Sequence, residues 1–383
     1  MPNPPNPPEL EALRTRIDAI DREVLELLAR RMKVVKEVAA VKQAHGLAIR
    51  DYVRERQVFD ARGRLAEQLG LSAGAIESIY RQILLSSRDY QAALGVAVER
   101  DVEPKTIAVI GGAGAMGQLM ARMFGELGHR VEIADVATAL TPEAATARAD
   151  VVVISVPIEA TTEVVKKLGP LVRPNALLMD VTSLKRDPVE VMLASTRASV
   201  SVVGTHPLFG PGVHTLQGQR FVVCPGRGDA WRQWLTRNLV ARGLVVTEAT
   251  AEEHDRAMAL VQVLTHFQTQ VLGLALADIG IPVEDSRRFT SPAYLMELYI
   301  AARHFGQDPA LYGPIEMRNP ERDRVVGAFC NAADELREIL RAEDQSRFNG
   351  VFERVRAFFG DFTAEATEQS SYLIDRLVER NLG

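Results

Sequence analysis

Residues 105–117 read Lys105-Thr-Ile-Ala-Val-Ile-Gly-Gly-Ala-Gly-Ala-Met-Gly117, and a stretch of helical length then leads to Val131-Glu-Ile-Ala-Asp135. The apolar run before the glycines predicts a strand, and the spacing Gly112-x-Gly114-x-x-Gly117 predicts a tight turn into a helix. In such a unit Gly112 allows the turn, Gly114 lets a pyrophosphate approach the backbone, and Gly117 lets the helix pack against the sheet. The helix N-terminus then points at the phosphates. The stretch therefore predicts a Rossmann-like dinucleotide-binding domain.

Asp135 indicates which dinucleotide binds. It ends the second strand about 20 residues after the glycines, where a carboxylate accepts the ribose 2′-hydroxyl and repels a 2′-phosphate. No Arg or Lys flanks it, which favours NAD over NADP. A chance glycine-rich turn would leave the flanking strand, the helix and Asp135 unexplained. The residues expected to bind the cofactor are Gly112, Gly114, Met116, Gly117 and Asp135.

Length, composition and charge narrow the class of protein. The chain has 383 residues, 47% of them hydrophobic, which is enough for two or three domains with sizeable cores. A net charge of −5 argues against a nucleic-acid partner. Cys224 and Cys330 have no metal-ligand spacing, so we expect no metal and a reducing compartment. Met1–Pro8 lacks the basic and apolar parts of a targeting signal, and we therefore expect a cytoplasmic protein.

One segment is long and apolar enough to suggest a membrane span. Ala257–Ala277 contains no Asp, Glu, Lys or Arg. It does contain Gln262, His266, Gln268 and Gln270. These polar residues favour a helix buried in protein, at a subunit interface, over a helix in lipid.

About a hundred residues precede the glycine motif, and they begin with one long helix. Residues 9–45 contain neither Pro nor Gly, and apolar residues recur at three- and four-residue intervals. A helix of this length, about 55 Å, extends beyond the core of a small domain, so we expect it to pack against a second copy of the chain. The stripe comprises Leu10, Leu13, Ile17, Ile20, Val24, Leu27, Val34, Val38 and Val41.

Cations interrupt this stripe. Between Leu27 and Val34, the position where the stripe would continue is Arg31. Lys42 follows eleven residues later on nearly the same face. Charges beside a buried stripe need anionic partners, either protein carboxylates or a ligand. Arg14 lies about 25 Å away along the helix, too far for the same pocket but within reach of the partner's pocket in a dimer.

Two more helices are expected, one from about residue 50 to Leu69 and one from Ala73 to about Leu94. On the last helix, Ser87 and Gln91 continue an apolar stripe. Any one of these polar residues would ordinarily be solvated surface. Polar residues on the apolar faces of three helices together favour an internal polar cavity.

These residues resemble the all-helical bacterial chorismate mutases over residues 9 to about 94. The resemblance implies that Arg14 of the partner subunit, Arg31 and Lys42 clamp the two carboxylates of chorismate. Asp51 and Glu55 would hold its hydroxyl, Ser87 a carboxylate, and Lys42 with Gln91 the ether oxygen; Arg54 would support Asp51 or Glu55. The matching stretches are Leu13-Arg14-x-x-Ile17-Asp18-x-x-Asp21, Leu27-Leu28-Ala29-x-Arg31, Val41-Lys42, Ile49-Arg50-Asp51-x-x-Arg54-Glu55-Arg56 and Ser87-x-x-x-Gln91.

After Asp135 strand-like and helical segments alternate, which predicts a doubly wound α/β sheet. From Glu252 onward long helices replace the strands, at about Glu253–Asp278, Ser291–Phe305, Glu321–Arg341 and Gln345–Asn381. We therefore expect three domains: helical (9–95), NAD-binding and Rossmann-like (104–249), and helical and dimerising (250–383). The expected strands are Val151–Val156, Ala176–Val181, Ser199–Gly204, Phe221–Cys224 and Leu244–Thr247.

Ser155 and His206 follow apolar runs at the carboxyl edge of this sheet, where cofactors bind, although a His beside a Pro is also common on a surface. This part resembles prephenate dehydrogenase. The resemblance implies that His206 accepts the proton of the ring hydroxyl while a hydride leaves the same carbon, that Ser155 orients His206 and the nicotinamide, and that Arg303 binds a carboxylate. Lys185 and His266 are further expected substrate-binding residues. The matching stretches are Gly112-Ala-Gly-Ala-Met-Gly117, Ile154-Ser-Val-Pro-Ile158, Ser183-Leu-Lys185, His206-Pro-x-Phe-Gly-Pro211, Glu253-His-Asp-x-x-Met258 and Ser291-Pro-x-Tyr294 with Glu297 and Arg303.

The domain order is similar to that of the bifunctional chorismate mutase–prephenate dehydrogenases of tyrosine biosynthesis. It implies a homodimer that converts chorismate to prephenate and oxidises prephenate to 4-hydroxyphenylpyruvate, and it admits feedback inhibition by tyrosine. Bifunctional members commonly carry an Arg eight residues before the position of Arg303, where this chain has Leu295. Three alternatives remain open: arogenate as the dehydrogenase substrate, a purely regulatory or dimerising N-terminal domain, and an unrelated NAD-dependent hydroxyacid dehydrogenase with a lysine acid–base group.

Overall fold

The computed structural model describes residues 7–45, 47, 49, 51–98 and 103–381, so Gly46 and Arg50, in the loop expected after the first helix, lie outside it. The described chain forms two compact units. The first comprises Met1–Ser155, Leu168–Val181 and Thr196–Glu248; the second comprises Val156–Lys167, Thr182–Ser195 and Ala249–Gly383.

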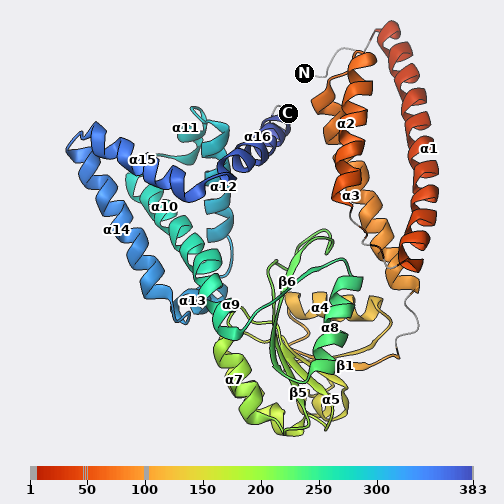
Figure 1. Cartoon of the computed structure of the whole chain (residues 1–383), viewed down its shortest axis with the longest axis vertical. Helices are drawn as coiled ribbons and strands as arrows, with labels where there is room; N and C mark the ends of the chain where they lie inside the picture. The colour runs from red at the N-terminus through yellow and green to blue at the C-terminus, as the bar shows by residue number, and fades with distance from the viewer. Residues whose placement is uncertain (1–6, 46, 48, 50, 99–102, 382–383) are drawn as a thin grey trace. The chain divides into compact units, whose positions relative to one another are not determined.

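Three helices open the chain, as the apolar periodicity predicts: α1 (Pro8–Ala44), α2 (Tyr52–Gln68) and α3 (Ala73–Val98) (Figure 1). The α2 helix starts at Asp51, whose carboxylate accepts a hydrogen bond from Arg54 N at 2.9 Å and caps the first turn. The α3 helix packs against both α1 and α2. It runs four residues beyond the expected end at Leu94, because nothing in Gly95-Val-Ala-Val98 forces a stop.

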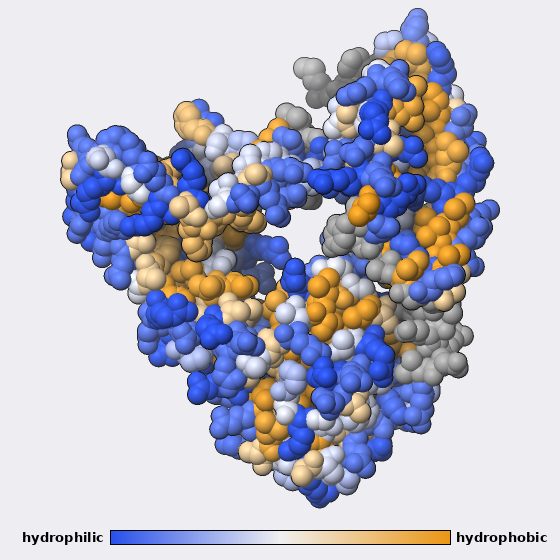
Figure 2. Space-filling model, in the orientation of Figure 1, coloured by the Kyte–Doolittle hydropathy of each residue, from blue (hydrophilic) through white to orange (hydrophobic). Residues whose placement is uncertain are grey.

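The apolar stripe of α1 is uncovered in a single chain. Among the described residues of α1, Val35 is the only buried hydrophobic residue. The predicted stripe is exposed along its whole length, from 38% at Leu10 to 59% at Ile20. Figure 2 shows hydrophobic side chains, in orange, gathered along this helix at the upper right. A contiguous apolar surface of this extent marks a contact site for another macromolecule.

The middle of the chain forms a seven-stranded sheet in the order β2-β1-β3-β4-β5-β6-β7. All strands expected from the sequence are present. Neighbouring strands are parallel except for β5 and β6. The reversal arises because residues 208–219 join two adjacent strands without a crossover helix. The strands are β1 (Thr106–Ile110), β2 (Arg130–Ala134), β3 (Val151–Ile154), β4 (Leu177–Asp180), β5 (Ser201–Pro207), β6 (Arg220–Arg227) and β7 (Val245–Glu248).

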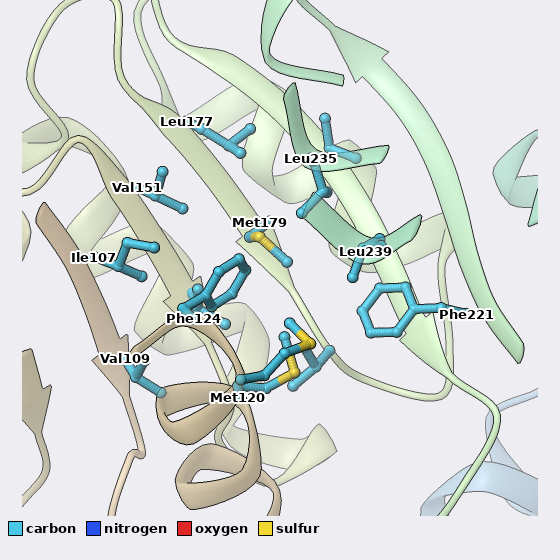
Figure 3. Packing of buried hydrophobic residues seen from close by; sticks show 14 of the residues in the cluster. Ile107, Val109, Met120, Phe124, Val151, Leu177, Met179, Phe221, Leu235 and Leu239 are labelled. Carbon is cyan, nitrogen blue, oxygen red and sulfur yellow. The ribbon is translucent and has the colours of Figure 1, made fainter. Parts of the chain in front are cut away.

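One face of this sheet carries the main hydrophobic core (Figure 3). Alternate strand residues such as Ile107 and Val109 point to one side, as the pleat requires. Phe124 from α4 (Ala115–Glu126) and Leu235 from α8 (Asp229–Ala241) pack on them and are fully buried. The remaining helical segments of the first unit are α5 (Pro142–Arg148) and a 3₁₀ turn (Gly169–Leu171).

The second unit is helical. Thr250 and Glu253 form a capping box that starts the C-terminal helices. The expected helix Gln345–Asn381 is in fact two helices, because Gly360 adopts a left-handed φ of 51° between them. The helices are α6 (Ile158–Leu168), α7 (Arg186–Ser195), α9 (Ala251–Met258), α10 (Thr265–Ile279), α11 (Val283–Arg287), α12 (Pro292–Phe305), α13 (Pro309–Met317), α14 (Arg322–Arg341), α15 (Gln345–Phe359) and α16 (Phe362–Asn381).

A π-helical segment, Ala259–Leu264, joins α9 and α10 into one continuous helix, Ala251–Ile279. By length and composition this helix could cross a membrane, and 17% of its most apolar stretch is buried in the single chain. One such helix is weak evidence of a membrane span, because the core helix of a protein passes the same test.

A buried histidine lies between the sheet and α8. Lys105 N donates to His129 Nδ1 at 3.3 Å, so Nε2 carries the proton that it shares with Asn238 Oδ1 at 2.9 Å. The imidazole is neutral in this arrangement. Burial lowers the pKa of His129 below its usual 6.5 as the largest cause. The ring of Trp234 lies 5.2 Å away, centroid to centroid.

We expect the central domain to lose stability as the pH falls below about 6.5, because the unfolded chain takes up a proton that folded His129 resists. The loss should approach about 1.4 kcal/mol per pH unit, the limit for one proton. The chain has two tryptophans, Trp231 and Trp234, both on α8, so tryptophan fluorescence during urea unfolding reports this domain. His129→Gln should flatten the dependence between pH 7.5 and 5.5, and an unchanged slope would contradict the assignment.

Candidate active sites

Polar side chains of the first unit meet where α1 and α3 pack. The Arg31 guanidinium donates to Ser87 Oγ, and Gln91 Nε2 donates to Ser87 O at 3.2 Å. Ser87 and Gln91 are buried, as their place on an apolar face predicts. Burial lowers the pKa of Arg31, although a guanidinium keeps its charge near neutral pH. Gln91 Oε1 is buried without a hydrogen-bond partner among the described residues, which suits a position that contacts a ligand or water.

A second group of polar side chains lies between α2 and α3. Glu55 forms an ion pair with Arg88, and both side chains are largely buried, at 14% and 17% exposure. Arg88 was not among the residues expected from the sequence, although it lies between Ser87 and Gln91. Its partner is on another helix, and sequence spacing along one helix does not reveal such a pair.

The other expected residues of this site are less buried. Lys42 Nζ donates to Ile49 O at 2.6 Å, and Asp51 caps α2. Arg54 is exposed and donates to Gln57 at 3.3 Å. Arg14 is exposed and pairs with Glu11 at 2.9 Å, on the same helix as Arg31 but far along it. An open hollow of about 480 Å³ lies on α1 beside Arg31, lined by Leu27, Arg30, Arg31, Lys33 and Val34.

The glycine motif forms a tight cradle between β1 and α4. A Cβ at Gly117 would lie 2.6 Å from both Gly111 O and Gly112 Cα, and a Cβ at Gly112 would lie 2.8 Å from Val109 O. The left-handed residue of the turn is Gly111, with φ of 78°. Gly112 is required instead for close approach of the backbone. Gly117 lets α4 approach the loop, in agreement with its expected role.

The cradle fits a dinucleotide. Gly114 is the N-cap residue of α4, no side chain caps this helix, and a Cβ there would find nothing closer than 3.4 Å. The first N–H groups of α4 are thus available to phosphate. Asp135 Oδ2 accepts from Ala113 N at 3.1 Å, so its carboxylate is held against the same loop. Met116, also on the first turn of α4, packs against the core cluster.

Ser155 and His206 both lie at the carboxyl edge of the sheet. Ser155 directly follows β3, and its N–H donates to Ile110 O at 2.8 Å. His206 lies inside β5, opposite Val222, and is 3% exposed, so the alternative of a surface loop histidine is wrong. The residue before it, Thr205, donates through N to Asp180 Oδ1 at 3.2 Å. Sequence reasoning missed Asp180, a fully buried carboxylate whose signal was its place at the end of an apolar strand.

In the second unit, Lys185 is fully buried and its Nζ donates to Thr182 Oγ1 at 3.2 Å. Asp255 accepts from Lys185 N at 2.9 Å and from Arg186 N at 3.0 Å, and thereby caps α7. Burial alone would raise the pKa of Asp255, but hydrogen bonds from His254 and these two backbone groups outweigh it and lower the pKa. His254 and Asp255 thus fix the backbone that carries Lys185.

His266 lies in an aromatic cluster of the second unit, 5.4 Å from His304 and 4.9 Å from Tyr312 between ring centroids. Burial, with the charge of His304 as the lesser cause, lowers the pKa of His266 to about 4, so the ring is neutral near pH 7. Burial also raises the pKa of Glu316, whose Oε1 is 3.7 Å from His266 Nδ1.

Arg303 is exposed near the end of α12. Leu295, eight residues earlier on the same helix, is buried. The position where bifunctional relatives commonly have an arginine is therefore part of the packing here, and Leu295 has no group that binds a carboxylate.

A glycine cradle, a carboxylate held against it and a buried histidine at the edge of one sheet are typical of an NAD-dependent dehydrogenase, preceded here by a helical domain with a polar site. Residues 13–92 match chorismate mutase type II, residues 126–245 the nucleotide-binding domain of prephenate dehydrogenase, and residues 250–354 its dimerization domain. The T-protein of Haemophilus influenzae is 34% identical over 368 residues, covering 96% of this chain and 97% of that protein. The T-protein of Enterobacter agglomerans is 34% identical over 366 residues, with the same coverage.

The chain belongs to the T-protein family, the bifunctional chorismate mutases and prephenate dehydrogenases of tyrosine biosynthesis. It has both activities and uses NAD. Among solved structures, prephenate dehydrogenase from A. aeolicus with hydroxyphenyl propionate and NAD+ has the same fold, with a TM-score of 0.55. The two sequences are 18% identical, and the structural match covers 67% of this chain and 98% of the A. aeolicus chain.

Gly117→Ala should weaken NAD binding at least about tenfold, because its Cβ would collide with the backbone of the cradle and push α4 away from the phosphates. Gly125→Ala is the matched control on the same helix, since nothing lies within 4 Å of its Cβ position. NAD titration by calorimetry measures both, and tryptophan fluorescence during urea unfolding, which reports α8, shows that the sheet domain is folded. Equal affinities for the two variants would show that the cradle is not the NAD site.

Proposed function

We propose that the polar residues shared by α1, α2 and α3 are the chorismate mutase site. Arg31, Lys42 and Arg14 of the partner subunit bind the two carboxylates of chorismate. Asp51 and Glu55 hold its hydroxyl, Arg54 supports them, Ser87 supports a carboxylate, and Gln91 with Lys42 faces the ether oxygen. The observation that carries this proposal is the hydrogen bond from Arg31 to buried Ser87, which holds a charged group on an otherwise apolar face.

The residue types suit the reaction. A Claisen rearrangement needs no nucleophile and no proton transfer, so catalysis comes from positioning and from stabilising a polarised transition state. Cations in a partly desolvated pocket interact with a dianion far more strongly than in water. The burial that lowers the pKa of Arg31 also strengthens its attraction for a carboxylate.

We further propose a cytoplasmic homodimer, with domains at 9–95, 104–249 and 250–383. Two apolar surfaces support the dimer. The α1 stripe is open along the whole helix. On the continuous helix Ala251–Ile279, Leu260, Val261 and Leu274 are more than half exposed. Because that helix lies within the matched dimerization domain, a second copy covers it better than lipid does.

At the dehydrogenase site, we propose that His206 accepts the proton of the ring hydroxyl and Ser155 orients it. Arg303 binds a prephenate carboxylate, and Lys185 and His266 are further substrate contacts. The residues that hold NAD are Gly112, Gly114, Met116, Gly117 and Asp135. Bound NAD supplies the hydride acceptor. The hydride leaves the carbon that bears the hydroxyl, and the C–C bond between the ring and its carboxylate breaks. Carbon dioxide departs, and the electron pair of the broken bond completes the aromatic ring.

The test of both activities is incubation with chorismate, with and without NAD, while prephenate and NADH are measured separately. Arg31→Ala should abolish the mutase reaction and leave prephenate oxidation nearly intact, because Arg31 lies in the helical site. Equal loss of both activities would show that one site serves both reactions.

Mixing Arg14→Ala with Arg31→Ala protein should restore part of the mutase activity. If Arg14 acts in the partner's site, a hybrid dimer contains one site with both arginines and one with neither. Subunit exchange is verified by mass spectrometry of differently tagged chains. A verified hybrid without activity would contradict a site shared between subunits.

His206→Asn should lower the dehydrogenase kcat by about two to four orders of magnitude, because the amide cannot accept the proton. The fall of kcat/KM at acid pH should disappear with the imidazole, while NAD affinity and mutase activity stay close to their original values. If the variant keeps most of its rate, His206 is a structural residue of β5 and another group accepts the proton.

A further inference from the structure

One charged group of the mutase region has no role in the proposed rearrangement. Arg88 is on α3, directly after Ser87, and reaches across to Glu55 on α2. Both side chains are at least four-fifths buried, at 17% and 14% exposure. Arg81 on the same helix also faces α2, where its guanidinium lies 4.8 Å from the ring centroid of Phe59, but its ion pair is with Glu77 of its own helix, and these two side chains are 37% and 41% exposed.

The turn of α3 from Ser87 to Gln91 thus connects to both neighbouring helices. Ser87 binds Arg31 of α1, and Arg88 binds Glu55 of α2. Gln91 donates to Ser87 O at 3.2 Å and closes the turn. The residue that supports Glu55 therefore lies beside the residue that supports Arg31.

Charge gives this contact a chemical consequence. The proposed substrate is a dianion, and Glu55 is a carboxylate proposed to accept its hydroxyl. Asp51 adds a second carboxylate one turn earlier on α2, and Arg31 supplies a cation from α1. Anions repel one another, so a carboxylate that must stay near a dianion needs a cation beside it to hold it in place.

We propose that Arg88 is a positioning residue of the mutase reaction, which holds the Glu55 carboxylate aimed at the substrate hydroxyl while the dianion is bound. This inference rests on the proposed role of Glu55. Arg88 acts through Glu55 and makes no contact with the substrate.

The decisive comparison is Arg88→Gln against Arg88→Lys. The glutamine keeps a hydrogen-bond donor but removes the charge, whereas the lysine keeps the charge. For Arg88→Gln the chorismate KM should rise about tenfold at pH 7.5 with a smaller change in kcat, the effect expected for losing a charge-assisted hydrogen bond. Arg88→Lys should restore most of the original KM.

Arg81→Ala is the matched control, because it removes a paired arginine from the same helix; its mutase profile should stay unchanged. Helical circular dichroism of every variant shows that the mutase region is folded, and unchanged prephenate oxidation shows that the effect is confined to it. If Arg88→Gln leaves the KM at its original value, or only lowers the melting temperature, Arg88 is a structural tie between α2 and α3 and the proposal is wrong.

Glu55→Ala separates this proposal from the one on which it rests. If Glu55→Ala keeps full mutase activity, Glu55 does not hold the hydroxyl, and both proposals fail. If Glu55→Ala loses activity and Arg88→Gln does not, the role of Glu55 stands and that of Arg88 fails. If both lose activity and the double variant is no worse than Glu55→Ala alone, Arg88 acts through Glu55 as proposed.

Discussion

An apolar stripe that runs the length of a 37-residue helix must be covered, and α2 and α3, with 17 and 26 residues, are too short to cover it. In the proposed dimer, a second copy of α1 lies along this stripe and brings the far end of one helix to the middle of the other. An exposed residue such as Arg14 then becomes part of a site that also contains Arg31. On this proposal, dimerisation and catalysis in this domain depend on the same hydrophobic surface.

The sequence predicted most of this architecture because the strongest signals are local. Periodicity located α1, and the glycines with Asp135 located the start of the sheet domain. The features that sequence reasoning missed depend on contacts between residues far apart in the sequence. The reversal of β6, the pair of Arg88 with Glu55, and the contact of Asp180 with Thr205 each join residues that no local pattern relates. The motif marks where glycine is needed but not why: Gly111 adopts the left-handed φ, whereas Gly112 is needed for close packing.

The two chemistries place different demands on their scaffolds. The rearrangement needs fixed charges at the right spacing, and helices with polar residues on their packed faces provide them. The oxidation needs a nucleotide cradle, which the turn between β1 and α4 provides, and a proton acceptor, for which we propose His206 near the end of β5. Neither scaffold contributes an essential group to the other reaction in the proposed scheme. This explains how one chain can carry both activities while each retains its own set of charged residues.

The π-helical segment Ala259–Leu264 determines in which directions the side chains of α10 point around the axis of the continuous helix. In a regular α-helix, side chains twelve residues apart, such as His254 and His266, differ by about 120° in direction. A π turn holds more residues than an α turn, so the π-helical segment changes this angle. The segment thus rotates the faces of α10 relative to those of α9, and the size of this rotation depends on the number of residues in the segment more than on their identity. Losing a single residue there would rotate α10 by about 100° relative to α9 while leaving every side chain of both helices unchanged.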